Sequence, residues 1–565
     1  THTYNTAVGY GAGYAVTTGI RNTIVGALAG DALTDADLNV VMGYNALSSD
    51  TLGSGAVAIG QGALNTQNFT TATTSYNVAV GYNAGGGTTT GVQNTVIGGL
   101  AGDSLTDADF NTAVGMQALT ADTLGSRSTA MGFFALGSQN FTTATNTYNT
   151  AVGYSAGGAV TTGIQNTFFG GTTGQATTDA DYNVAMGYGA LYTNILGSKS
   201  TAIGVSALQN QNFTTATDSF NTAVGYTAGL AITTGTSNTI IGAEAGNNIT
   251  TGGGNFAAGY GSLTNETKGN SSIAIGSLAL LSQNFTTSTN AYNVAIGEQT
   301  GRNITTGIQN TIIGGLAGDA LTDADYNVAI GGNALGANTV GSRSVAVGYG
   351  ALTSHNPATA IDTYNTAVGM LAGENVTTGT NNTIVGGLAG DAITTGARNT
   401  LLGTAAGGAL ATANSDNTFI GCSSGENITS GDANTILGRY NGNQGGLDIR
   451  TASNNIVLSD GDGNPRLFLS HDGDLFIGCT STPSASVTGF AVQDNAGKCL
   501  VQQATSDASA NTVNQFINPN GVVGTINTNG SATNYNTSSD YRLKENVVYD
   551  WDATTRLKQL KPARF

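Results

Sequence analysis

Apolar and polar positions alternate in a short unit that recurs along most of the chain. The unit reads "NTAVG" at residues 5–9 and returns as "NTIVG", "NVVMG" and "NVAIG", each closed by a glycine. We count 25 copies, with closing glycines from Gly9 to Gly438. Successive closing glycines are 17, 17, 17 and 21 residues apart, which gives a super-period of 72 residues between Gly9 and Gly369. A unit this short fits one coil of a β-solenoid and is too short for a pair of helices.

The apolar positions inside the unit predict which side chains face the core. The residue before the closing glycine is large and apolar in 24 of the 25 copies, as in Val8 and Met42, and we expect it to point inward. The residue two before the glycine would then point outward, yet it is apolar in every copy and is usually alanine, as in Ala58. Because a strand that is apolar on both faces is covered on both faces, this alanine stripe predicts that chains associate, most simply as a parallel trimer. The alternative is that the stripe packs against another wall of the same coil.

Asparagine and a recurring insertion mark the turns of the coil. Asparagine stands four residues before the closing glycine in 20 copies, where it tolerates tight-turn dihedrals and can hydrogen-bond from coil to coil. Every fourth coil is four residues longer, in a stretch such as "QNFTTAT" that places Phe69, Phe141, Phe213 and Phe285 at equivalent positions, with Pro357 breaking the series. Insertions in solenoids form loops on one face.

Composition and charge narrow the range of partners. The chain has 565 residues with 84 glycines and 5 prolines, and its net charge is −17. Lysine and arginine are scattered singly before residue 539, whereas a phosphate-binding surface needs them clustered, so nucleic acid is not an expected partner. No apolar run is long enough for a membrane span. The three cysteines and three histidines lie far apart, so we expect no metal site and no cofactor.

The regular repeat ends near residue 440. Residues 441–480 include "NNIVLSDGDGNPRLFLSHDGDLFIG", which predicts strands joined by Asp-Gly turns. Residues 481–539 are rich in serine, threonine and asparagine, and "NPNGVVGTINTNG" indicates short strands. The predicted organisation is therefore a solenoid shaft over 1–440, a strand transition over 441–480, a neck over 481–539 and a distinct segment over 540–565.

The repeats resemble those in the heads of trimeric autotransporter adhesins, which are parallel β-rolls wound as trimers. The resemblance covers residues 4 to 440 and rests on the "NTAVG" and "SVAVG" units, although the 17-residue coils are longer than is usual in that family. Residues 481–537 are similar to the neck of a phage tail fibre. The repeat count and spacing predict an all-β parallel solenoid of about 25 coils with a short mixed segment at the C-terminal side, and the resemblance implies that it is wound as a homotrimer.

The last residues resemble the start of the intramolecular chaperone of endosialidase-type phage tailspikes and fibres, the peptidase S74 domain. The strings that carry the resemblance are "SSDYRLKENV" at 538–547 and "LKQLKPARF" near residue 565. In that family the domain assists trimerisation and then cuts itself off between a serine and an aspartate, here Ser539 and Asp540. The resemblance implies Ser539 as nucleophile and Lys544 as base, with Arg542 as a neighbour that can lower the pKa of the lysine. The simpler interpretation is that Ser539 and Asp540 only cap a helix or strand.

Three other patterns are candidates for binding sites. The "LTDAD" repeats, as at 33–37, pair aspartates, but they lack a calcium-binding nonapeptide and predict solvated loops. The stretch "DGDGNP" at 460–465 has proline and histidine where a calcium loop needs glycine and glutamate. Tyrosines follow the closing glycine at Tyr10, Tyr44, Tyr82, Tyr154 and Tyr188, where a row of exposed rings could stack on sugars or could simply cover turns.

Together these patterns predict a structural and host-adhesion fibre of a virus, a bacteriophage tail fibre located in the virion and extracellular. Its expected partners are two further copies of the chain, tail or baseplate proteins, and a host surface receptor for which a glycan is one candidate. Autoproteolysis is the one expected enzymatic activity. A polysaccharide-degrading tailspike and a bacterial trimeric surface adhesin are the alternatives; the few glutamates of the shaft fall on different coils, which argues against a two-carboxylate cleft.

Overall fold

A computed structural model describes residues 3–411, 413–484, 486–495, 498–504, 511–519, 521–529 and 532–537. The described residues form strands and turns, with no helix among them. The chain divides into two compact units, Thr1–Asn417 and Thr418–Phe565. The fold is a parallel β-solenoid of about 27 turns with coils of roughly 17 residues, which confirms the predicted fold class.

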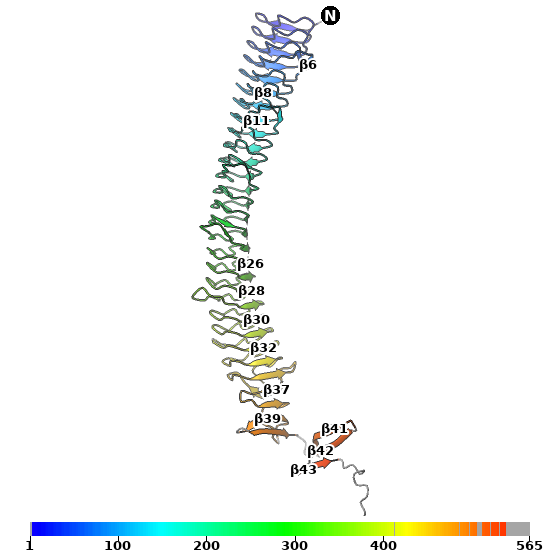
Figure 1. Cartoon of the computed structure of the whole chain (residues 1–565), viewed down its shortest axis with the longest axis vertical. Coiled ribbons are helices and arrows are strands. Elements are labelled where there is room, and N and C mark those ends of the chain that lie inside the picture. The colour runs from blue at the N-terminus through cyan, green and yellow to red at the C-terminus, as the bar shows by residue number, and fades with distance from the viewer. Residues whose placement is uncertain are drawn as a thin grey trace, which may run out of the picture. The chain divides into compact units, whose positions relative to one another are not determined.

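Unit 1 is a stack of three-residue strands, one for each coil (Figure 1, blue to yellow). Neighbouring strands are parallel and in register, so that Thr6 pairs with Thr23 and Thr23 pairs with Val40. The strands of the stack are β1 (Thr6–Val8), β2 (Thr23–Val25), β3 (Val40–Met42), β5 (Val57–Ile59), β7 (Val78–Val80), β8 (Thr95–Ile97), β9 (Thr112–Val114), β11 (Thr129–Met131), β13 (Thr150–Val152), β14 (Thr167–Phe169), β15 (Val184–Met186), β17 (Thr201–Ile203), β19 (Thr222–Val224), β20 (Thr239–Ile241), β21 (Phe256–Ala258), β23 (Ile273–Ile275), β25 (Val294–Ile296), β26 (Thr311–Ile313), β27 (Val328–Ile330), β28 (Val345–Val347), β29 (Thr366–Val368), β30 (Thr383–Val385) and β31 (Thr400–Leu402).

The closing glycine ends each strand at a corner where no other residue fits. Gly43 has φ = 135°, a conformation that residues with a Cβ rarely adopt. A Cβ added to Gly43 would also lie 2.5 Å from the carbonyl oxygen of Gly60 in the next coil. Backbone conformation and the close approach of stacked corners therefore both require glycine here.

The predicted directions of the two apolar columns are wrong. The middle residue of each strand is the buried one: Val41, Phe168 and Leu401 are each 0% exposed. The residue before the closing glycine points outward, and Met42 and Phe169 are 46% and 52% exposed. We call these residues before the closing glycine the outward column. The physical reason is the two-residue period of a strand, which puts the outward column on the same face as the threonine two positions earlier.

The buried alanine stripe packs against another wall of the same coil, so it no longer supports association between chains. In the third and fourth coils of a block the middle strand residue is usually alanine, as at Ala130, and a leucine from the next wall fills the core, as Leu136 does. Where it is large, as at Phe168, that wall carries a glycine instead. A Cβ added to Gly174 would lie 2.3 Å from the Phe168 ring. Large and small residues thus exchange between the two walls in these coils, whereas in the first coil of a block both are small, as at Ala151 and Gly157, and the Phe168 ring of the next coil reaches Gly157.

The asparagine column joins the coils as predicted. The backbone N–H of Asn22 donates to Oδ1 of Asn5 at 2.8 Å, and the N–H of Asn39 donates to Oδ1 of Asn22 at 2.9 Å. Nδ2 of Asn22 donates to the carbonyl of Ala36 at 2.7 Å. Each of these buried side chains satisfies backbone groups in two coils, which fixes the register of the stack.

The four-residue insertions form loops that are pinned by short parallel pairs, and their phenylalanines fold inward. Phe69 and Phe141 are 5% and 6% exposed. The pairs are β4 (Gly53–Ser54) with β6 (Thr73–Thr74), β10 (Gly125–Ser126) with β12 (Thr145–Asn146), β16 (Gly197–Ser198) with β18 (Thr217–Asp218), and β22 (Gly269–Asn270) with β24 (Thr289–Asn290).

Unit 2 begins with parallel coils and changes to antiparallel strands. β32 (Thr418–Ile420), β33 (Thr435–Leu437) and β36 (Ile456–Ser459) are parallel, and β34 (Asn443–Gln444) and β35 (Leu447–Asp448) form a small hairpin. β36 then starts a meander with β37 (Pro465–Leu469), β38 (Leu475–Ile477), β39 (Gly489–Asn495) and β40 (Lys498–Ala504). A separate antiparallel sheet contains β41 (Asn511–Asn518), β42 (Gly521–Asn529) and β43 (Ala532–Thr537). The strands predicted between Asp-Gly turns are present.

Candidate functional site

The residues predicted for autoproteolysis lie outside the described residues. Ser539, Asp540, Arg542 and Lys544 all belong to the range 538–565. The serine nucleophile and lysine base therefore stay predictions, and the sites that follow are built from other residues.

A row of exposed aromatic rings follows the closing glycines of unit 1. Each ring belongs to the residue directly after the corner, where the chain leaves the strand. The exposed fraction runs from 51% for Tyr44 to 83% for Tyr10. The sequence pattern predicted five of these tyrosines, and the structure adds three at equivalent positions. We call the set the tyrosine row: Tyr10, Tyr44, Tyr82, Tyr154, Tyr188, Tyr226, Tyr260 and Tyr349.

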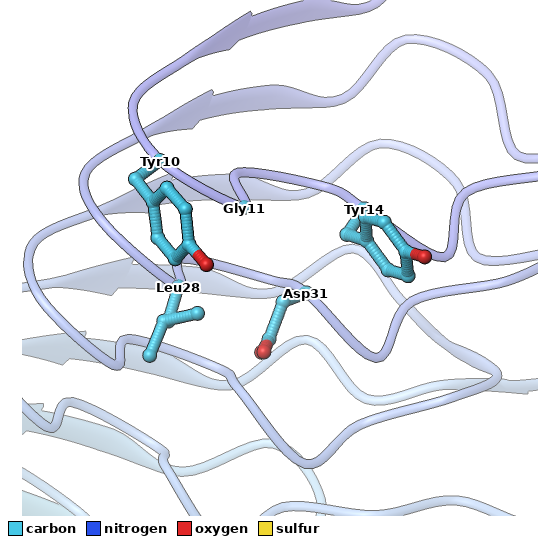
Figure 2. Close-up of a pocket in the computed structure, with 5 residues that line it drawn as sticks. All are labelled: Tyr10, Gly11, Tyr14, Leu28 and Asp31. Carbon is cyan, nitrogen blue, oxygen red and sulfur yellow. The ribbon is translucent and has the colours of Figure 1, made fainter.

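The first ring of the tyrosine row lines a pocket of about 320 Å³. Its walls are Tyr10, Gly11 and Tyr14 from the first coil and Leu28 and Asp31 from the second. Figure 2 shows the two rings on the first coil, with the leucine and the carboxylate on the coil below. One carboxylate oxygen of Asp31 has no hydrogen-bond partner among the described residues. That oxygen is itself buried from solvent, so the pocket combines two aromatic rings with a carboxylate group in its wall.

Buried polar pairs form a second feature of unit 1, which the sequence patterns did not predict. Seven residues after the closing glycine, the third coil of a 72-residue block carries an acid or amide and the fourth coil carries glutamine or histidine. All of these side chains are 0% exposed. We call each pair a polar node. The five nodes are Asp50 with Gln67, Asp122 with Gln139, Asn194 with Gln211, Glu266 with Gln283, and Asn338 with His355.

The second node shows how a buried carboxylate is satisfied. Gln139 donates from Nε2 to Oδ2 of Asp122 at 2.6 Å. The backbone N–H groups of Gly125 and Phe141 donate to Oδ1 at 3.1 and 3.2 Å. Oε1 of Gln139 in turn accepts from Nδ2 of Asn149 at 2.9 Å. Burial raises the pKa of Asp122, and the hydrogen bonds, led by that from Gln139, oppose part of the rise.

The fifth node lacks this network. His355 is fully buried, and neither ring nitrogen has a hydrogen-bond partner with acceptable geometry among the described residues. Burial lowers the pKa of His355 to about 4, and a nearby backbone group of Thr377 offsets part of that effect. Asn338 bonds instead to the backbone of Gly341, whose N–H donates to Oδ1 at 2.8 Å and whose carbonyl accepts from Nδ2 at 2.8 Å. This imidazole is neutral over the usual pH range.

The aspartate motifs have structural contacts. In "LTDAD", Asp35 is exposed, whereas Asp37 is half-buried and its Oδ1 accepts from the backbone N–H of Ile20 at 2.7 Å. In "DGDGNP", Oδ1 of Asp460 accepts from the N–H of Asn464 at 2.8 Å within the turn. Within the described ranges, no group of three or more His, Cys, Asp or Glu side chains could hold a metal ion. The same ranges contain no helix long and apolar enough to cross a membrane.

No protein-family model, no curated protein sequence and no solved structure matches this chain. Its function is therefore inferred from its own residues.

Proposed function

We propose that this chain is a structural and host-adhesion fibre of a bacteriophage, assembled as a homotrimer and released from a C-terminal self-cleaving chaperone. The observation that supports it most is the long apolar face on the outside of a regular parallel stack. A β-solenoid of this kind serves as a rigid spacer, and its outer columns offer extended surfaces for other molecules.

The outward column supports association between copies. Fully burying a Val or Leu side chain removes roughly 60–120 Å² from water, so a half-exposed one offers roughly 40 Å². Nine residues of the outward column are more than a third exposed and the others are partly exposed, so the column offers several hundred Å², of the order of the roughly 800 Å² that one partner contributes to a standard interface. Parallel sheets also normally have both faces covered. The parallel trimer thus keeps its physical basis, although the contacting column is Met42, Phe169 and their equivalents and not the alanine stripe.

The test of assembly is the molar mass of the chain in solution, measured by light scattering after gel filtration. We expect three times the chain mass. Replacing Ile203 and Ile241 of the outward column with lysine should release monomers, because each buried lysine would lose its hydration. Thr70→Lys, in an exposed insertion loop, is the matched control and should leave the trimer intact. A wild-type monomer at micromolar concentration would contradict the proposal.

The proposed cleavage has its own experiment. Serine is a weak nucleophile without a base, so Ser539 needs Lys544 in its neutral form. The intact mass of the full-length gene product, measured under denaturing conditions, should show a break between Ser539 and Asp540. Ser539→Ala and Lys544→Ala should each abolish the break, and Ser538→Ala should not. An uncut wild type would return the bacterial adhesin to equal standing.

A further inference from the structure

The tyrosine row is interrupted at a fixed point in every block. The second coil of each 72-residue block has alanine or glycine at the row position, while three blocks have tyrosine on the coils before and after it. With coils about 4.8 Å apart, the two rings of such a pair lie about 10 Å apart along the stack. The three pairs and the small residues between them are Tyr10 and Tyr44 around Ala27, Tyr154 and Tyr188 around Gly171, and Tyr226 and Tyr260 around Ala243.

The small residues leave room between the rings. A Cβ added at Gly99 or Gly315, at the same position of other blocks, would meet no atom within 4 Å. At Gly171 the nearest atom is Cδ2 of Tyr188, at 3.5 Å, so the ring leans over the glycine. Contact on both sides of an inserted ring needs about 7–8 Å between the flanking planes, which a separation of about 10 Å provides. By this spacing each pair borders a slot about wide enough for one sugar ring, and in the third block the Tyr188 ring itself reaches over Gly171.

The pocket in Figure 2 lies beside the slot of the first block and shares Tyr10 with it, while Tyr44 and Ala27 are not part of the pocket lining. Beside Tyr10, Tyr14 adds a second ring on the first coil, 87% exposed, and Asp31 contributes a carboxylate to the wall. A sugar has an apolar C–H face and a rim of hydroxyls. The face packs on an aromatic ring, and the hydroxyls donate to a carboxylate or exchange hydrogen bonds with tyrosine hydroxyls. Both kinds of group are present in this pocket.

We propose that the tyrosine row binds a neutral saccharide, one sugar residue in each slot. The proposal rests on the proposed function, because it names the surface molecule that an attachment fibre would recognise. Charge disfavours acidic sugars, because Asp31 lines the pocket at Tyr10 and the chain carries a net charge of −17; the residues equivalent to Asp31 in the other two paired blocks are the neutral Gln175 and Asn247. Such a field repels a polyanion.

A second copy of the chain fits this surface less well than a saccharide. The outward column is apolar in every coil and large in all but one, as a continuous interface requires, whereas the tyrosine row alternates rings with gaps and with polar residues such as Gln61 and Glu298. Repeated gaps flanked by rings suit a ligand made of repeating small units. Association through this row is therefore kept as an outcome of the test.

The test is binding of the whole chain to an array of neutral oligosaccharides, with sialylated and uronic-acid oligosaccharides of equal length beside them. We expect binding to at least one neutral glycan. Tyr10→Ala, Tyr154→Ala and Tyr226→Ala, combined, remove one ring from each slot and should weaken that binding at least tenfold. The matching triple change to phenylalanine should retain most of it, since the ring faces remain. Tyr292→Ala, which removes a tyrosine of similar exposure outside the row, is the matched control and should bind as the wild type does.

The remaining outcomes overturn the proposal. They are a wild type that binds no neutral glycan, one that binds only acidic glycans, and a triple alanine variant with unchanged affinity. A triple alanine variant whose molar mass falls would show that the row is a contact between copies, and this too would overturn it. If the chain is trimeric and self-cleaving yet binds no neutral glycan, only this inference fails. If a monomeric chain binds through the slots, the fibre model fails instead.

Discussion

The second and fifth polar nodes occupy the same place in the coil and solve the same burial problem differently. Asp122 has its carboxylate satisfied by Gln139 and by two backbone N–H groups. In the fifth block asparagine replaces the acid and His355 replaces the glutamine, with both ring nitrogens lacking an acceptable partner. The same pair of backbone positions thus holds a carboxylate with hydrogen-bond donors in one block and, in another, a neutral imidazole without hydrogen-bond partners of acceptable geometry among the described residues.

The difference shows that residues of a node depend on one another. Phe141 donates its backbone N–H to the carboxylate, and its equivalent in the fifth block is Pro357, which has no N–H to donate. A carboxylate in the fifth node would therefore lack both that donor and the glutamine donor. Asn338 carries no charge and bonds to the Gly341 backbone on its own. The neutral amide is the side chain that this weaker set of donors can accommodate.

The largest expected effect is at the second node. Gln139→Leu removes the shortest hydrogen bond to a buried carboxylate and leaves Asn149 without one acceptor. Breaking a buried charged network from one side costs about 4 kcal/mol. We expect amide hydrogen exchange, followed by mass spectrometry, to become faster in peptides over 129–153, by the factor that corresponds to this loss of local stability.

The fourth block provides the internal control for this change, because Glu266 and Gln283 are untouched there. Exchange in peptides over 273–297 should stay at the wild-type rate. Equal protection of both regions in the variant would mean that the node contributes nothing to local stability.

The fifth node should lose stability in acid. The folded pKa of His355 is about 4, below the ordinary 6.5, so the unfolded chain takes up the proton first as the pH falls. The stability present above pH 6.5 is then lost between pH 6.5 and about 4, by about 3 kcal/mol for a shift of this size. Exchange protection over 345–369, corrected for intrinsic rates, should fall across that window.

His355→Gln should abolish the acid step, since glutamine does not titrate. Gln139→His supplies the reverse test, because an imidazolium beside the carboxylate of Asp122 would be paired and should not reproduce the loss. If wild-type protection over 345–369 does not change between pH 7 and 4, the ring is more accessible to water than its burial indicates.

The sequence predicted the solenoid because stacking forces every coil to repeat its constraints. The corner at Gly43 and the hydrogen-bonding Asn22 must recur in each turn, so their spacing reveals the coil length directly. The direction of the two apolar columns was missed, although a signal existed. Thr23 and Val25 are two residues apart and share a face, and a polar residue at the first position marks that face as the outer one.

The polar nodes were missed for a different reason. Asp122 and Gln139, taken singly, look like ordinary polar loop residues, and only their packing shows that they are buried. Their regular return every 72 residues was the available signal, and it gives the super-period a physical account: two coils with an apolar residue at this position usually alternate with two coils that carry a polar pair. The proposed roles of Ser539 and Lys544 came from resemblance alone, and burial or geometry could not have suggested them.

A smaller effect is expected when the fifth node is given the side chain of the other four. His355→Gln at pH 7 supplies an amide that can donate to Asn338 and accept from Asn365, as Gln211 does with Asn194 and Asn221. New hydrogen bonds to buried groups contribute about 1 kcal/mol each, and part is offset by the smaller volume of glutamine. We expect a net gain of about 1 kcal/mol in exchange protection over 345–369, with unchanged protection over 129–153. A loss of protection would show that this coil is shaped around the imidazole.

The smallest effect should follow from removing the charge of the second node. Asp122→Asn copies the residue that the chain itself uses at Asn194. Because burial raises the folded pKa of Asp122 above its unfolded value, the folded chain holds the proton more tightly, and the aspartate node loses stability as the pH rises through that window. The asparagine node has no such pH dependence. The stability of the variant should therefore lie within about 1 kcal/mol of the wild type, and the difference should favour the variant most at a pH above the folded pKa of Asp122. Amide hydrogen exchange in peptides over 112–141, compared at pH 4 and pH 8, measures both the stability difference between the two proteins and its dependence on pH. A variant less protected by about 3 kcal/mol at pH 8 would mean that the node needs its charge, and that the neutral fifth node is weak because it lacks a carboxylate and not because its imidazole is unsatisfied.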